Sequence, residues 1–184
     1  FTTGARFLGS DRPESDPDAR LAREAKSFAA VIAGWRDAVL TKPEPIDVYD
    51  AKGVALAIVE RATRRSADVR RLDELPAHLH PRAAGAVMIA GRDVGTFGMI
   101  HPRVERAIEL DGPCAIIELD LDALIAIGAR VPQYRPIPVL PASTRDIALV
   151  VSDDVSAGDI QRTIAEAAGE LAERIELFDR YRHE

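Results

Sequence analysis

The sequence predicts an α+β fold in which an antiparallel sheet with helices is followed by an incomplete β-α-β unit. Three observations lead to this prediction. Two apolar runs, 86–90 and 94–100, are joined by a short segment that contains glycine, which is typical of a β-hairpin. An alanine-rich pattern that starts at Asp50 is typical of a helix. Four prolines between Val131 and Pro141 then mark a linker before a strand–helix–strand pattern, because proline removes a hydrogen-bond donor and fixes φ.

The N-terminal part of the chain contains less regular signals. The segment Ser10–Asp18 is rich in Asp, Pro and Ser and is predicted to be an exposed loop. The apolar run 28–33 is compatible with a buried strand or with the end of a helix that begins near Ala19, because periodicity does not distinguish the two. Residues 46–49 alternate in polarity, which predicts a half-buried strand before the helix at Asp50.

The remaining elements are predicted from apolar runs and from turn and capping residues. The hairpin turn is placed at Gly91–Asp93, and Gly128 is expected to end a helix that Asp120 or Asp122 caps. In chain order, the sequence also predicts a helix over 104–110, a strand over 114–119, a helix over 123–127, a strand over 147–151, a helix over 156–174 and a strand over 175–178.

Composition excludes several classes of protein. The single cysteine, Cys114, excludes an internal disulfide and a thiolate cage for zinc. No apolar run approaches the roughly 20 residues of a membrane-spanning helix. The opening residues do not resemble a secretion signal, so we expect a cytoplasmic protein, and a chain cut from a longer one.

The charge pattern limits any contact with RNA to a local surface. The net charge is −6, and residues 142–184 carry 5 basic and 10 acidic side chains. The one concentrated basic cluster could touch an RNA backbone or could be the solvated end of a helix, since Asp68, Asp73 and Glu74 lie alongside it. The possible RNA-contacting residues of this cluster are Arg61, Arg64, Arg65, Arg70 and Arg71.

Two His-Pro pairs, at His80 and His101, could be metal ligands or proton carriers. Neither has a second ligand at helical or hairpin spacing unless His78 joins His80, so structural roles at strand-to-loop corners are expected instead.

The glycines do not predict a phosphate-binding loop, and the acidic residues do not predict an acid–base site. Gly91, Gly95 and Gly98 do not form a phosphate loop, because a strand rather than a helix is predicted to follow them. Asp47 and Asp50 lack the nucleophile and apolar pocket of an acid–base site. The sequence therefore predicts no catalytic residue and no metal site.

Short motifs follow one another in order along the chain between residues 46 and 181. Residues 46–53 are similar to the phrase VDFFDLKG, and residues 79–84 are similar to LHPGRSA. Residues 91–102 are similar to a hairpin written G..IG.IGELHP, and residues 117–124 to FELDL..L. RDIALVV is present unchanged at Arg145–Val151, and LFDxY is present at 177–181. Together, in this order, they resemble the C-terminal part of the β subunit family of bacterial phenylalanine–tRNA ligases. The motif residues to which the resemblance gives structural roles are Asp50, Lys52, Gly53, His80, Pro81, Gly95, Gly98, His101, Pro102, Arg145, Asp146, Phe178, Asp179 and Tyr181.

The resemblance implies a fold and a function. Residues 1–140 would form a class-II-synthetase-like antiparallel sheet that has lost its catalytic motifs, and residues 141–184 would begin a ferredoxin-like domain that contacts the anticodon region of tRNA. The chain would be a non-catalytic scaffold that docks the catalytic α subunit in an (αβ)2 assembly. That holoenzyme would attach phenylalanine to its tRNA with ATP and Mg²⁺, and the chain alone would bind neither ATP nor amino acid. The alternative is a stand-alone RNA-binding or regulatory relative with the same pseudo-catalytic fold.

Overall fold

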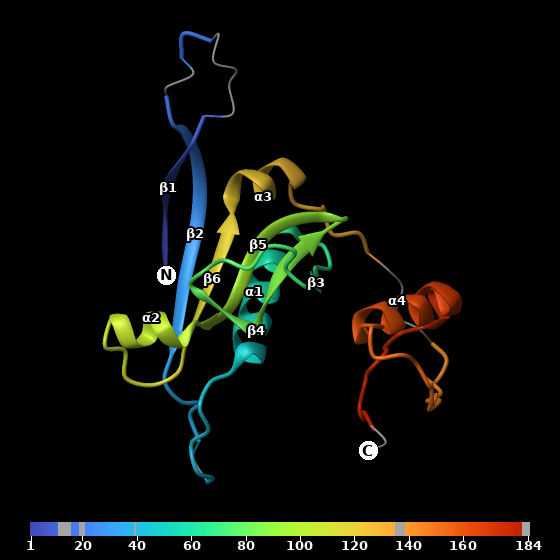
Figure 1. Ribbon diagram of the computed structural model, residues 1–184. Coiled ribbons are helices and arrows are strands. Elements are labelled where there is room, and N and C mark those ends of the chain that lie inside the picture. The colour runs from blue at the N-terminus through green and yellow to red at the C-terminus, as the bar shows by residue number, and fades with distance from the viewer. Residues whose placement is uncertain (11–15, 19–20, 39, 135–138, 182–184) are drawn as a thin grey trace. The chain divides into compact units, whose positions relative to one another are not determined.

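The computed structural model describes residues 1–10, 16–18, 21–38, 40–134 and 139–181 (Figure 1). The chain divides into two compact units, Phe1–Pro132 and Gln133–Glu184. The division lies in the proline-rich segment, of which residues 135–138 are outside the described residues, and the domain limits at 140 and 141 stay a prediction. The predicted loop Ser10–Asp18 is likewise described only in part.

The first unit is built on one six-stranded sheet. Its neighbouring strands are antiparallel throughout, in the order β1-β2-β6-β5-β4-β3. The strands are β1 (Thr2–Leu8), β2 (Arg23–Ala33), β3 (Asp68–Arg70), β4 (Leu79–Ile89), β5 (Arg92–Ile100) and β6 (Cys114–Asp120). The α+β class and the antiparallel sheet are thus confirmed, and the apolar run 28–33, whose structure the sequence left open, lies in a strand.

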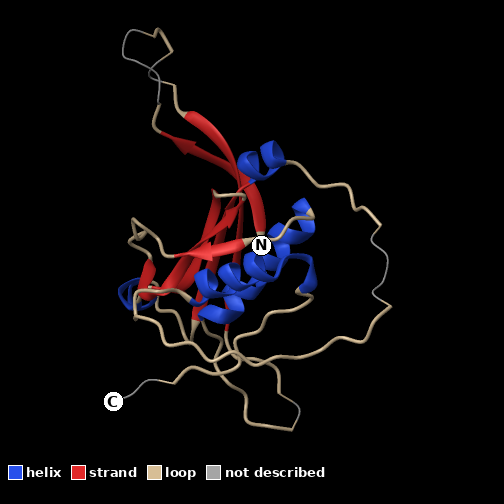
Figure 2. Ribbon diagram, turned by 90° about the vertical axis from the view of Figure 1, so that its right-hand side faces the viewer, coloured by secondary structure: helices blue, strands red, loops and turns tan. Residues whose placement is uncertain are grey.

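The β1–β2 pair extends beyond its neighbours as a two-stranded ribbon (Figure 1, Figure 2). Residues 23–29 of β2 pair with β1, whereas residues 27–33 pair with β6. The residues of β2 that precede Ser27 therefore have a partner on one side alone, which leaves their side chains mostly exposed.

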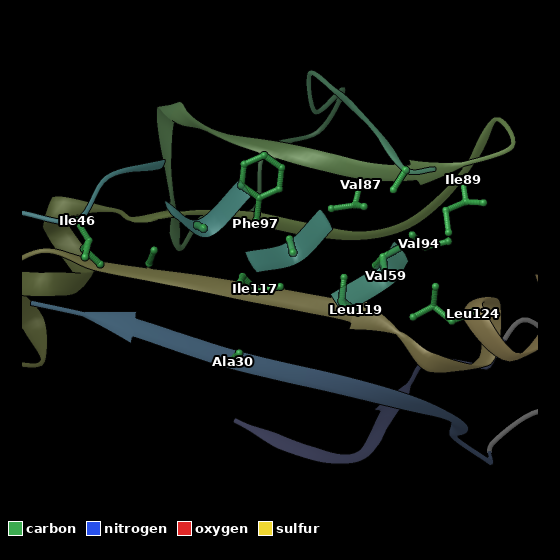
Figure 3. Packing of buried hydrophobic residues seen from close by; sticks show 14 residues of the cluster. Ala30, Ile46, Val59, Val87, Ile89, Val94, Phe97, Ile117, Leu119 and Leu124 are labelled. Carbon is green, nitrogen blue, oxygen red and sulfur yellow. The ribbon is translucent and has the colours of Figure 1, made fainter. Parts of the chain in front are cut away.

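Helix α1 (Val48–Thr63) covers one face of the sheet and packs against β4, β5 and β6 (Figure 1). Its buried side chains recur every fourth residue, at Ala51, Ala55, Val59 and Thr63. Small alanine side chains let the helix axis approach the strands closely. The core between them contains Val87, Ile89, Val94, Phe97, Ile117, Leu119 and Leu124 (Figure 3).

The strand predicted over residues 46–49 is wrong, because α1 begins at Val48. Asp47 accepts hydrogen bonds from the N–H groups of Tyr49 and Asp50, and the side chain of Asp50 accepts one from the N–H of Asp47. This capping box satisfies the first backbone donors and starts the helix earlier than the apolar pattern suggested. Ile46 precedes the helix and is buried, and its N–H donates to the carbonyl of Gly34 at 3.1 Å.

The predicted hairpin is confirmed as β4 and β5, with its turn one residue earlier than expected. Ala90 and Gly91 occupy the turn with φ values of +50° and +76°, and β5 already starts at Arg92. Two left-handed residues in a two-residue loop match the twist of the flanking strands. The apolar pattern alone did not show which residues adopt positive φ.

Two short helices follow β5 and β6. Helix α2 (Pro102–Ala107) begins and ends earlier than the predicted 104–110, because His101 caps it and proline suits its first position. Of the two possible caps of α3 (Leu121–Ile127), Asp120 is the one used, and its Oδ1 accepts from the N–H of Ala123 at 2.9 Å. Asp122 instead accepts from the N–H of Lys26 at 2.8 Å, and Gly128 ends the helix as expected.

The second unit contains helix α4 (Ala157–Ala168) and a 3₁₀ turn, η1 (Gly169–Leu171). The predicted helix over 156–174 is therefore shorter, because Gly169 adopts a φ of +55° and ends it. The strands predicted over 147–151 and 175–178 are wrong for the described residues. Neither segment has a ladder partner there, and a strand needs a hydrogen-bonded neighbour.

The described helices include none with the length and apolar character needed to cross a membrane.

Candidate functional site

One arginine fixes the start of α1. The Nε of Arg36 donates to Asp50 Oδ1 at 3.0 Å, and its Nη2 lies 2.8 Å from Asp47 Oδ2 and 2.8 Å from Asp50 Oδ2. Its Nη1 lies 3.2 Å from Glu44 Oε2. Hydrogen bonds from Arg36 lower the pKa of both aspartates. Carboxyls held ionised in this way are poor proton acceptors near neutral pH, so the geometry favours a structural clamp over acid–base chemistry.

Acid is expected to weaken this clamp. The folded-state pKa values of Asp47 and Asp50 lie below the ordinary value of 3.8, so the clamp's contribution to stability is complete above the unfolded-state pKa, about 3.9. It is lost as the pH falls through the lower folded-state values. Asp50→Asn is expected to lower the urea midpoint near neutral pH and to flatten its decline in acid. Urea titrations from neutral pH into acid measure both.

The control for that titration is Asp111→Asn. The Asp111 side chain is exposed and has no hydrogen bond or ion pair within the described part of the chain. Its substitution is expected to leave the urea midpoint and the acid dependence unchanged. An acid dependence identical in Asp50→Asn and in the unmodified chain would contradict the clamp.

The two His-Pro pairs lie near the ends of secondary-structure elements. His101 Nδ1 accepts from the N–H of Arg103 at 3.0 Å and so caps α2. His80 Nδ1 accepts from the N–H of Arg82 at 3.1 Å. His80 is the second residue of β4, directly after a turn, and the pairing of β4 with β5 is irregular between Leu79 and Ala84.

His78 does not join His80. Its Nε2 lies 3.2 Å from Glu118 Oε2, on the sheet face that side-chain alternation turns away from Ile117 and Leu119. This contact does not have the geometry of a hydrogen bond, and His78 Nε2 has no hydrogen-bond partner in the described chain. Within the residues that the structure describes, no three His, Cys, Asp or Glu side chains are grouped to hold a metal ion.

The glycines of β5 allow close packing of strands. A Cβ added at Gly95 would lie 2.3 Å from the carbonyl oxygen of Glu118, and one added at Gly98 would lie 2.7 Å from the Cβ of Ala84. Both positions are inside a strand, so neither aims backbone N–H groups at a phosphate as a helix N-terminus would. Gly53 in α1 differs, because a Cβ there would meet nothing within 4 Å.

The structure separates the five arginines of the predicted cluster. Arg61 lies in the last turn of α1, Arg64 caps the helix with a φ of +55°, and Arg65 follows it. Arg70, on β3, forms ion pairs with the side chains of Asp73 and Asp93, and its Nη1 donates to the carbonyl of Arg71 at 2.9 Å. Arg61 and Arg64 share a shallow depression with Ala57 and Glu60.

A further arginine joins the end of α1. The N–H of Arg130 donates to the carbonyl oxygen of Thr63 at 2.7 Å, which places Arg130 beside Arg64. No local signal in the sequence connects Arg130 with α1. The hydrogen bond forms because the chain returns past the helix end after α3, and it satisfies one of the last carbonyl groups of the helix.

The motif residues of the second unit lie on its surface. Arg145 Nη1 donates to Ser143 Oγ at 2.6 Å and to the carbonyl of Thr144 at 2.9 Å. Phe178 and Tyr181 are 74% and 82% exposed. Asp146 and Asp179 are exposed as well. Within this unit α4 turns Ile160 and Ile164 toward a shallow groove that also contains Leu149, Val151, Val155, Asp159 and Thr163.

Comparison with known proteins gives two family matches and a set of relatives. Residues 1–121 match the family described as "Phenylalanyl tRNA synthetase beta chain CLM domain", and residues 138–184 match the "Ferredoxin-fold anticodon binding domain". The chain is 35% identical over 183 residues to the phenylalanine–tRNA ligase beta subunit of Yersinia pestis, which covers 98% of this chain and 22% of that protein.

Two other curated relatives bear the same name. The protein of Novosphingobium aromaticivorans is 35% identical over 191 residues, covering 99% of this chain and 23% of its own length. That of Shouchella clausii is 30% identical over 190 residues, covering 100% of this chain and 22% of its own length. The chain therefore spans less than a quarter of the relatives it matches.

Proposed function

The chain belongs to the family of the phenylalanyl tRNA synthetase beta chain CLM domain, and we propose that it is a non-catalytic scaffold and subunit-docking part of a phenylalanine–tRNA ligase β subunit. The complete ligase would attach phenylalanine to its tRNA with ATP and Mg²⁺ in the cytoplasm. We assign residues 1–140 to the pseudo-catalytic domain and residues 141–184 to the start of the anticodon-binding domain.

The observation that carries this proposal is the order of the two family matches along one chain. A CLM domain followed by an anticodon-binding match, with relatives aligned over almost the whole sequence, favours a ligase subunit over a stand-alone RNA-binding relative. The second match also supports tRNA as a partner of the complete protein.

The carboxylates at the start of α1 are poorly suited to hold Mg²⁺ with ATP. Magnesium needs carboxylates that can turn toward it, and these are held by Arg36. The residues that the structure describes contain no group of three His, Cys, Asp or Glu side chains that could hold a metal ion. We therefore place nucleotide and metal binding in other parts of the ligase and derive no step of the reaction here.

Exposed apolar side chains support the docking role. On the β1–β2 ribbon and at the adjoining end of β2, Phe7 is 72% exposed, Val31 is 61% exposed and Trp35 is 56% exposed. Phe7 is paired with Glu24 and Val31 with Ile116, so these two side chains lie on opposite faces of the sheet and do not form one patch. Strand β1 is the edge of the sheet, and an exposed edge strand with apolar side chains is a template for contact with another chain. We propose that these strands contact the catalytic α subunit in an (αβ)2 assembly.

A charge placed at these apolar positions is expected to weaken assembly. Phe7→Asp and Val31→Asp, each in the complete β subunit co-expressed with its α subunit, are expected to raise the dissociation constant of the α–β complex at least tenfold. Burying an unpaired carboxylate in an interface costs more than the roughly 1.4 kcal/mol that a tenfold change represents. Analytical ultracentrifugation of the purified complex measures the effect.

The matched control is Val54→Asp, on α1 rather than on the ribbon. Val54 is 39% exposed, so the substitution adds the same carboxylate at an apolar position outside the proposed contact. This variant is expected to assemble normally. Equal assembly of all three variants would rule out docking through these strands.

A further inference from the structure

We propose that the end of α1 is a binding surface for the phosphate backbone of tRNA, formed by Arg61, Arg64, Arg65 and Arg130. The identity of the ligand rests on the proposed function, whereas the existence of the surface rests on the geometry of the first unit alone. Nothing in either family description assigns this surface, which lies outside the anticodon-binding match.

A buried threonine brings the backbone of these arginines together. Thr63 is 1% exposed, and its hydroxyl donates to the carbonyl of Val59 at 2.8 Å. The N–H of Arg65 donates to Thr63 Oγ1 at 3.4 Å, and the N–H of Arg130 donates to the Thr63 carbonyl at 2.7 Å. Two separate segments of the chain are thus joined at one buried residue.

The helix end orients the other two arginines. Arg64 follows Thr63 directly as the C-cap, and its N–H donates to the carbonyl of Glu60 at 2.7 Å. Arg61 stands one turn earlier and lines the same depression as Arg64. The backbone at the four positions is therefore held by a packed helix end, so little backbone entropy is lost when a ligand binds.

The guanidinium groups at this surface are available to an anion. All four arginines are exposed, and none forms an ion pair within the described residues. The two nearest carboxylates along the chain are Glu60 and Asp68, and Glu60 Oε1 is engaged by the N–H of Ala67 at 3.1 Å. Arg70 gives the contrast, because Asp73 and Asp93 already neutralise it.

Phosphate is the chemistry that fits this arrangement. Arginine presents a planar fork of donors that matches a phosphate, and the helix C-terminus carries partial negative charge, so the attraction must come from the side chains. The chain as a whole is acidic, with a net charge of −6, and contact with RNA must be local and sensitive to salt. Arg130 also lies just before Pro132, where the chain leaves the first unit.

The test measures tRNA binding by the complete ligase, with both subunits present. The variant combines Arg61→Gln, Arg64→Asn, Arg65→Gln and Arg130→Gln; asparagine is chosen at position 64 because it tolerates positive φ. Filter binding of a phenylalanine-specific tRNA transcript is measured across a salt series. The slope of log K against log salt is expected to become shallower by about 0.7–0.9 for each lost phosphate contact.

Two controls separate the loss of charge from the loss of fold. Arg70→Gln removes one positive charge that is already neutralised, and it is expected to leave the slope unchanged. A second variant with lysine at all four positions retains the charge and is expected to keep most of the slope.

Three results would overturn the inference. A combined variant with the wild-type slope would exclude the surface while leaving the proposed ligase function intact. Loss of α–β assembly in the combined variant would mean that the surface binds protein. If the unmodified ligase bound no tRNA at low salt, both the proposed ligase function and tRNA as the ligand of this surface would be rejected.

Discussion

Gly95→Ala is expected to be among the most destabilising single substitutions in the first unit. The added Cβ would lie 2.3 Å from the carbonyl oxygen of Glu118 and 2.9 Å from the Cα of Leu119. Both atoms belong to the backbone of β6, which pairs with Gly95 and cannot move away without breaking that ladder. Overpacking typically costs about 1–3 kcal/mol, and we expect a value at or above the top of that range. Urea unfolding followed by circular dichroism measures the loss.

The control is Gly53→Ala, at another glycine of the family motifs. Gly53 is an exposed residue of α1, and a Cβ there would meet nothing within 4 Å. Alanine in a helix interior is more stable than glycine by about 0.5–1 kcal/mol, so this variant is expected to gain stability. If Gly95→Ala were as stable as the unmodified chain, the close approach of β5 to β6 described above would be incorrect.

The parts of the fold that could be predicted from sequence are those set by neighbouring residues. The hairpin, a cap at Asp120 or Asp122 and the stop at Gly128 follow from interactions within a few positions; the hairpin and the stop are confirmed, and the structure uses Asp120 as the cap. The start of α1 shows how such signals compete. Residues 46–49 alternate like a strand, but Asp47 and Asp50 form a capping box whose hydrogen bonds outweigh four residues of alternation.

Contacts between distant residues could not be predicted in the same way. Arg36 meets Asp50, His78 meets Glu118 and Arg130 meets Thr63 because strands and helices intervene and return the chain. The predicted arginine cluster shows the same limit. Sequence proximity grouped Arg70 with Arg61, but the ion pair of Arg70 on β3 with Asp93 on β5 depends on β4 pairing with both of these strands. The predicted strands of the second unit depend on neighbours that the sequence pattern does not specify.

Phe97→Ala is expected to have the largest effect among core truncations. Phe97 is 3% exposed and lies in the core between the sheet and α1 (Figure 3). Replacing a buried phenylalanine by alanine costs about 3–5 kcal/mol, because transfer energy is lost and a cavity remains. Phe7→Ala is the matched control, since Phe7 is 72% exposed and its loss is expected to change the free energy of unfolding by less than about 0.5 kcal/mol. Urea unfolding of the two variants gives the comparison.

A double substitution tests whether the ring of Phe97 occupies the place described. A Cβ added at Gly85 would lie 2.8 Å from Phe97 Cζ and 3.0 Å from Cε1, with Val69 Cγ1 at 3.1 Å as the next contact. Gly85→Ala is therefore expected to destabilise the unmodified chain but to be neutral or stabilising beside Phe97→Ala, where the ring is gone. The interaction energy between the two substitutions should exceed the deviation from additivity of about 0.3–0.5 kcal/mol that is expected for independent sites. Additive effects within that error would mean that the ring does not lie over Gly85, and the packing of β4 against β5 would need revision.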